Sequence, residues 1–178
     1  METDGLLPDR PGRCISPRPI GPTPFVVLAL LATANTAPLI AARLFPWFDR
    51  PVDGGRKLRD GRPLLGASKT WRGIVAALAG TLVAGRLLGV RPVLAGQVAL
   101  LSMLGDLCAS FAKRRIGIAL HGRSVVLDRV PEAALPLVLL KRLDLRRGER
   151  FAIVLAFALL EEPLSRVLHR LGLRDRPF

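Results

Sequence analysis

The chain has 178 residues, half of them hydrophobic, with a mean hydropathy of +0.35 and a formal net charge of +13. The apolar residues gather in blocks and the charged residues gather between them, which is the arrangement that a lipid bilayer requires and which disfavours a soluble globular domain. The basic residues are divided among short loops instead of forming one stripe, so we expect no nucleic-acid partner.

Residues 1–24 are rich in Pro, Gly and Arg and contain no apolar run. We therefore expect a disordered leader there and no cleavable signal peptide. The remaining residues, 25–178, are expected to form one transmembrane domain. Cys14 falls in the leader and Cys108 in an apolar block, so the two cysteines predict neither a disulfide framework nor a zinc site.

Four apolar blocks are long enough, or nearly so, to cross about 30 Å of hydrocarbon. They comprise residues 25–42, 74–90, 93–112 and 151–168. In the second block, Gly80 and Gly85 are expected to let another helix approach closely. In the last block, we expect Glu161, Glu162 and Pro163 to break the helix at the membrane interface, and the alternative is a role for the two acids in a headgroup cavity.

A fifth segment, residues 130–143, is short by the criterion of ~20 apolar residues for a span. It either crosses the membrane or re-enters it, and we favour the crossing. Lys and Arg are abundant in the loop before residue 74 and in the loop after residue 112. The positive-inside rule therefore places both loops in the cytoplasm and the turn at residues 90–92 on the opposite side.

A carboxylate lies inside the third apolar block, where a charge is costly and is by default a functional candidate. On a helix, Asp106, Ser110 and Lys113 are spaced i, i+4 and i+7 and share one face, with Arg114 at its edge. The alternative is structural, because Asp106 could simply pair with Arg114 or cap a helix junction.

A second carboxylate, Asp128, follows the next loop beside Arg129. Two acids of this kind can hold Mg²⁺ together with phosphate oxygens of a substrate. The neighbouring cations would then hold the remaining phosphate charge.

The first basic loop places glycines beside Lys69, Thr70 and Arg72. Backbone N–H groups and cations in such a loop can converge on a phosphate. The pattern is not a P-loop, because Gly-x-x-x-x-Gly-Lys-Ser/Thr is absent. A solvated turn with Trp71 as an interfacial anchor explains the same residues equally well.

Taken together, these motifs resemble the CDP-archaeol synthase family, which is related to the CDP-diacylglycerol synthases. The resemblance covers most of the chain after residue 25, and several separated matches in the same order make it specific. The matching residues are 60–62, 66, 69–73, 105–107, 110, 113–114, 128 and the ending 171–175.

The resemblance implies an all-α membrane protein, a small bundle of about five transmembrane helices with cytoplasmic catalytic loops. It implies a CTP-dependent cytidylyltransferase of the plasma membrane that converts a lipid phosphate, of the archaeol ether type or phosphatidate, to a CDP-lipid and pyrophosphate. The implied cofactor is Mg²⁺. The implied partners are CTP, the lipid phosphate and the bilayer, and a homodimer is left open.

Carried across residue by residue, the resemblance assigns metal binding to Asp106 and Asp128. The same two acids and Lys113 are the expected catalytic residues. The residues expected to contact the nucleotide or the lipid phosphate are Lys69, Thr70, Arg72, Ser110, Lys113, Arg114 and Arg129. Asp53 and Asp60 are weaker candidates in the same loop.

The chain departs from the family pattern just after Asp128. At that point the family tends to have a second acid, and this chain does not. Here the sequence reads Asp128, Arg129, Val130, Pro131, Glu132. Either Glu132 substitutes from a shifted position or one metal ligand is missing.

Two other functions fit part of the sequence. A non-catalytic or degenerate membrane protein could bind anionic lipids through its basic loops, which explains the net charge but not Asp106. A different phospholipid transferase, such as a CDP-alcohol phosphotransferase, would need an Asp-Gly-x-x-Ala-Arg signature, which the chain lacks.

Overall fold

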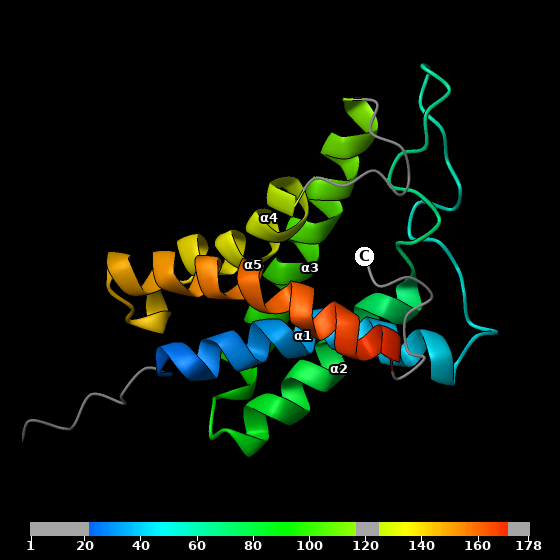
Figure 1. Cartoon of the computed structure of the whole chain (residues 1–178). Coiled ribbons are helices and arrows are strands. Elements are labelled where there is room, and N and C mark those ends of the chain that lie inside the picture. The colour runs from blue at the N-terminus through cyan, green and yellow to red at the C-terminus, as the bar shows by residue number, and fades with distance from the viewer. Residues whose placement is uncertain (1–21, 117–124, 171–178) are drawn as a thin grey trace, which may run out of the picture.

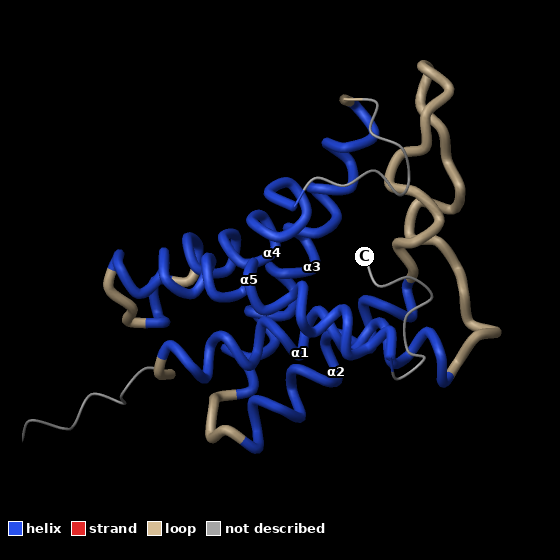
Figure 2. Tube along the Cα trace, viewed as in Figure 1, coloured by secondary structure: helices blue, strands red, loops and turns tan. Residues whose placement is uncertain are grey.

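The computed structural model describes residues 22–116 and 125–170, and within them the side chains of residues 22–116 and 129–160. The described residues form five α-helices and one 3-10 turn. These are α1 (Pro24–Leu44), α2 (Trp71–Leu87), α3 (Pro92–Arg115), α4 (Val125–Leu139), η1 (Lys141–Leu143) and α5 (Arg147–Arg170). The helices pack into a bundle, and the long loop between α1 and α2 extends from one end of it (Figures 1 and 2). The predicted all-α class is confirmed.

Helix α2 begins and ends at residues suited to those positions. The Thr70 hydroxyl accepts the backbone N–H of Gly73 at 3.2 Å, so the helix starts three residues earlier than the apolar block. At the other end, Gly89 adopts a left-handed φ of 70° and the N–H of Val90 donates to the carbonyl of Gly85 at 2.7 Å. This Schellman motif reverses the chain directly into α3.

Small residues let α2 approach its two neighbours. A Cβ added to Gly80 would lie 2.9 Å from the Cβ of Ala37 in α1, and one added to Gly85 would lie 2.6 Å from the Cβ of Ala95 in α3. The predicted close approach at these two glycines is confirmed, and it packs α2 against both α1 and α3.

Helices α3 and α4 also touch through a glycine. A Cβ on Gly105 would lie 2.3 Å from the carbonyl oxygen of Pro131 and 2.9 Å from the Cα of Glu132. Backbone therefore lies directly on backbone at this crossing. Since Asp106 is the next residue of α3, the crossing fixes the position of that carboxylate relative to α4.

The helices connect two distinct ends of the bundle. Helix α1 runs from Pro22 and Thr23 to the long loop, α2 returns, and α3 runs back to the loop. Helix α4 packs along α3 and α5 and ends at η1, near the start of α1 and the α2–α3 turn. The segment 130–143 is thus a helix that starts earlier than predicted and ends in a 3-10 turn. The number of membrane crossings stays a prediction.

The bundle is apolar both inside and on much of its surface. Val27, Leu30 and Leu31 of α1 are completely buried in the core. Phe25 and Leu87 are each 82% exposed, as are many other large apolar side chains to a lesser degree. Among the described residues, α1 and α3 are long and apolar enough to cross a membrane by length and composition. An outer surface of this kind suits contact with lipid.

The expected helix break near the end of the chain is wrong. Helix α5 continues without interruption through Glu161, Glu162 and Pro163 to Arg170. Proline removes one backbone hydrogen bond, and a helix packed in a bundle tolerates that loss where its neighbours compensate. The carboxylates therefore belong to a continuous helix.

Candidate active site

The loop of residues 45–70 is folded back on itself by backbone hydrogen bonds. The N–H of Val52 donates to the carbonyl of Lys69 at 2.8 Å, and the N–H of Trp71 donates to the carbonyl of Arg50 at 3.0 Å. These two bonds pair the start of the loop with its end. They hold Lys69 immediately before the first turn of α2.

Asp53 organises the interior of this loop. Its carboxylate accepts the backbone N–H groups of Gly55 and Leu65, both at 2.9 Å, and of Gly66 at 3.1 Å. Burial raises the pKa of the Asp53 carboxyl, but the hydrogen bonds from Leu65, Gly55 and Gly66 outweigh burial and hold the pKa below its usual value. Gly66 has a φ of 102°, a conformation that side chains rarely adopt. Asp53 is therefore a structural anchor of the loop.

A second set of contacts ties the loop tip to the end of α3. Arg115 donates to the Asp60 carboxylate at 2.6 Å and to the carbonyl of Pro63 at 2.9 Å. Arg62 donates to the carbonyl oxygens of Arg114 and Arg115 at 3.3 and 2.9 Å, which caps the C-terminus of α3. The hydrogen bond from the backbone N–H of Arg62 lowers the pKa of the exposed Asp60 carboxyl, desolvation opposes this, and Arg115 lowers it further.

The central contact of the site joins Lys69 to Asp106. The Lys69 Nζ lies 2.6 Å from Oδ1 and 2.5 Å from Oδ2 of Asp106, and the two side chains are only 22% and 20% exposed. The cation belongs to the loop and the carboxylate to α3. Two of the residues predicted for the site thus come together across the fold, and the predicted alternative of an Asp106–Arg114 pair is replaced by a pair with Lys69.

The other predicted residues of α3 follow Asp106 toward its C-terminus. Ser110 and Arg114 are both buried, each 7% exposed, and lie one and two turns beyond Asp106. Lys113 is half-buried on the same segment. Arg114 was predicted at the edge of this helix face, and the structure shows that its side chain is buried there. The last two turns of α3 therefore present a carboxylate, a hydroxyl and two cations beside the loop.

Three further predicted residues make structural contacts. Arg72 donates to the carbonyl of Phe45 at 2.7 Å and to the Asp49 carboxylate at 3.0 Å, which fastens the start of α2 to the end of α1. Thr70 caps α2 as described. Arg129 donates to the carbonyl of Ala158 in α5 at 2.9 Å. The structure places the backbone of Asp128 in α4, and its side chain lies outside the described residues.

Asp106 and Glu132 are carboxylates of the chemical kind that a magnesium ion takes as ligands. Mg²⁺ in nucleotide enzymes takes one or two carboxylates and completes its shell with substrate phosphates and water. Asp106 provides one half-buried carboxylate, and Glu132, only 6% exposed, starts from the point where α4 touches Gly105. In the part of the chain that is described, no three His, Cys, Asp or Glu side chains gather in one place. A substrate would therefore have to supply several of the ligands.

The residues that sequence reasoning missed are the ones that hold the loop. Arg62 and Arg115 were not among the candidates, although together they join the loop to α3. The Asp-Gly pairs at Asp53 and Asp60 were the available signal, because Asp followed by Gly is typical of tight turns with side-chain to backbone hydrogen bonds. Both acids were considered instead as weaker candidates for the site.

Comparison with known proteins identifies the family to which the chain is similar. The family model described as CDP-archaeol synthase (CarS-like) matches residues 25–178. A CDP-archaeol synthase of Hyperthermus butylicus is 32% identical over 82% of this chain and 85% of the relative. One of Sulfurisphaera tokodaii is also 32% identical, over 72% of this chain and 81% of the relative.

A solved structure shares the fold. It is described as "Structural insight into an intramembrane enzyme for archaeal membrane lipids biosynthesis", and it aligns with a TM-score of 0.68 at 28% identity. The alignment covers 79% of this chain and 91% of that chain. The resemblance seen in the motifs is confirmed along most of the sequence. This chain belongs to the CDP-archaeol synthase family and is an integral membrane enzyme.

Proposed function

We propose that this chain transfers a cytidylyl group from CTP to a membrane lipid phosphate of the archaeol type, with the Lys69–Asp106 pair at the reaction centre. The observation that carries the proposal is the position of that pair. An acid and a base, both mostly buried, meet where the folded loop covers the polar end of an otherwise apolar helix. A soluble nucleotide and a lipid headgroup can reach one place only at such a boundary.

The reaction needs positioning more than an activated side chain. A lipid phosphomonoester has a second pKa of about 6 and is largely a dianion at neutral pH. One of its oxygens attacks the α-phosphorus of CTP, a new P–O bond forms, and the bond between the α-phosphorus and the bridging oxygen breaks to release pyrophosphate. The protein must hold two anions in line and offset their repulsion.

The residues around Asp106 supply that positioning. Asp106 would hold Mg²⁺, which supplies neutralisation of the triphosphate charge when it is bound. The Lys69 ammonium, which now occupies the carboxylate, would turn toward the phosphates of the nucleotide. Lys113 and Arg114 would contact the remaining phosphate oxygens, and the Ser110 hydroxyl would donate to one of them.

The contacts of the loop indicate positioning roles for the other candidates. The Arg72 guanidinium donates hydrogen bonds to the Phe45 carbonyl and the Asp49 carboxylate, so we propose that it assists phosphate binding by holding the loop in place. Thr70 fixes the start of α2 and with it the position of Lys69. Asp128 is proposed as a second metal ligand and Arg129 as a residue that positions α4 against α5.

The proposed orientation places this site in the cytoplasm, at the plasma membrane. The support is the density of Lys and Arg in the loop of residues 45–70 and in the last turn of α3. CTP is a cytoplasmic metabolite, so the orientation agrees with the proposed substrate. A homodimer stays a prediction.

The experiment is a transfer assay with purified full-length protein. Label from CTP is followed into the lipid phase with an ether-linked isoprenoid lipid phosphate or phosphatidate as acceptor, and with Mg²⁺ or with EDTA. We expect Mg²⁺-dependent label in the lipid and release of one pyrophosphate per CDP-lipid, with the ether lipid preferred. Folded protein that transfers no label to either lipid would contradict the proposal.

A further inference from the structure

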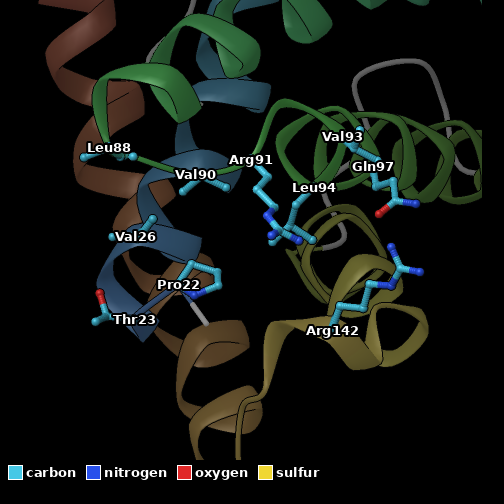
Figure 3. Close-up of a pocket in the computed structure, with 11 residues that line it drawn as sticks. Pro22, Thr23, Val26, Leu88, Val90, Arg91, Val93, Leu94, Gln97 and Arg142 are labelled. Carbon is cyan, nitrogen blue, oxygen red and sulfur yellow. The ribbon is translucent and has the colours of Figure 1, made fainter. Parts of the chain in front are cut away.

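A cavity of about 610 Å³ opens at the end of the bundle opposite the loop (Figure 3). The start of α1, the α2–α3 turn, the start of α3 and η1 enclose it. Its volume lies in the range of about 300–1,000 Å³ that is typical of sites for small molecules. Helix α1 separates this cavity from the loop, and its 21 residues span about 30 Å. The cavity is therefore distinct from the proposed active site.

The polar groups of the cavity are cationic or neutral. Arg91 comes from the α2–α3 turn, Arg142 from η1 and Gln97 from α3, and Figure 3 shows the side chains of Arg142 and Gln97 pointing toward one another. Among the described residues, no Asp or Glu lines the cavity. Neither guanidinium has an ion-pair or hydrogen-bond partner among the described residues. Two arginines of this kind favour a ligand with a phosphate group.

Apart from Thr23, the rest of the lining is apolar, and it is open to the outer surface of the bundle. Val26, Val90 and Leu94 form the walls, and Val93 at the rim is 68% exposed. Phe25, one residue from Val26, is 82% exposed. In a membrane protein these exposed apolar side chains contact lipid chains. A ligand that fits both parts carries an anionic head and an apolar tail.

We propose that this cavity binds the phosphate headgroup of an anionic lipid from the leaflet opposite the proposed active site. The two guanidiniums hold the phosphate, the Gln97 amide donates to it, and the chain of the lipid follows Val26 and Val93 into the bilayer. The headgroup would join three segments that few polar contacts join otherwise. It would thereby stabilise the bundle without taking part in catalysis.

The test compares lipids and variants on the full chain. Protein in nanodiscs of phosphatidylcholine, with or without phosphatidylglycerol of the same chains, is unfolded by heat, and the bound lipid is counted by native mass spectrometry. The variants are Arg91→Gln, Arg142→Gln and the double substitution. Arg86→Gln and Arg147→Gln are matched controls, because both residues are exposed and neither lines the cavity.

We expect phosphatidylglycerol to raise the melting temperature of the wild type and of both controls. In each single variant its apparent affinity should fall by roughly tenfold, as expected for loss of one charged hydrogen-bond partner. In the double variant the stabilisation should vanish. Asp106→Asn protein should keep it, which separates this site from the proposed active site.

Three results would overturn the proposal. Equal stabilisation of the double variant and the wild type would show that the lipid binds elsewhere. Equal stabilisation by inorganic phosphate in phosphatidylcholine nanodiscs would identify a soluble anion as the ligand. If the double variant fails to fold, the single variants decide. Lipid counts and melting shifts equal to those of the wild type in both single variants would also show that the lipid binds elsewhere.

Discussion

The two ends of the bundle treat their charges in opposite ways. At the loop end, Lys69 pairs with Asp106 and Arg115 pairs with Asp60, and backbone carbonyls take up further guanidinium donors. At the other end a tight Schellman turn joins α2 to α3, and Arg91 and Arg142 line a cavity where, in the described part of the chain, they have no acidic partner.

The difference shows that the positive charges of an apolar bundle have different roles at its two ends. Paired charges fix a loop whose backbone would otherwise be free, so the groups at the loop end are already positioned for phosphate chemistry. Arg91 and Arg142 are exposed and have no ion-pair partner among the described residues, so an anion from outside the chain can bind them. The carboxylate of Asp106 lies at the loop end, and among the described residues no Asp or Glu lines the cavity at the other end.

Removing the cation of the central pair should produce the largest effect at the loop end. Lys69→Met should lower the transfer rate by about a hundredfold, because a positioned cation that stabilises transferring phosphates is worth about that much. The measurement is the initial rate of label transfer at saturating CTP. Lys57→Met, an exposed lysine of the same loop, is the control and should keep nearly full activity. Equal losses in both variants would show that only the overall loop charge matters.

A substitution in the middle of α3 should separate packing from chemistry. Gly105→Ala places a Cβ against the Pro131 carbonyl and should destabilise the protein by up to about 3 kcal/mol, since backbone cannot move aside as a side chain can. Thermal unfolding in detergent measures this change. Gly96→Ala is the matched control on the same helix, because its Cβ would meet only Leu82 Cδ2 at 3.7 Å and Leu78 Cδ1 at 3.9 Å. A Gly105→Ala protein as stable as Gly96→Ala would contradict the described α3–α4 crossing.

The Asp53 anchor gives the loop end a dependence on pH. The folded pKa of this carboxyl lies below its unfolded value, so its contribution to stability is present above the unfolded pKa, about 3.9, and is lost as the pH falls through the folded pKa. Asp53→Asn should cost about 1–2 kcal/mol at neutral pH, where charged hydrogen bonds are lost. The gap in melting temperature between the wild type and Asp53→Asn should narrow in acid. A gap that widens below pH 4 would refute the assignment.

The smallest effect is expected at the loop tip. Arg115→Gln removes an exposed ion pair with Asp60, and exposed pairs of this kind contribute little to stability. Hydrogen exchange of the Leu58 and Leu64 amides, both hydrogen-bonded within the loop, should quicken a few-fold. Arg59→Gln, an exposed arginine of the same segment, should leave that exchange unchanged. Unaltered hydrogen exchange in Arg115→Gln would mean that the hydrogen bonds within the loop stabilise its tip without the ion pair to Asp60.

Sequence reasoning predicted what depends on local pattern. The apolar blocks became helices within a few residues, and Gly80 and Gly85 mark close helix contacts as predicted. Asp106 was singled out because a carboxylate within an apolar helix is costly. Its pairing with Lys69 is a contact between distant segments, which depends on how the loop folds over α3.

The remaining differences have similar causes. The continuation of α5 through Pro163 reflects the tolerance of a packed helix, which overrides the preference of the residue itself. The roles of Asp53 and Asp60 required knowledge of which backbone N–H groups would converge on them. The cavity at the other end draws residues from four separate segments, and no single motif indicates such a site.

The most direct test of the central claim is the transfer assay on Asp106→Asn beside the wild type, with Mg²⁺, labelled CTP and the ether-linked lipid phosphate. Asp144→Asn is the matched control, because Asp144 is exposed and its left-handed conformation suits asparagine. The account predicts that Asp106→Asn folds but loses at least about a hundredfold in rate, while Asp144→Asn stays active. Full turnover by folded Asp106→Asn protein would contradict it.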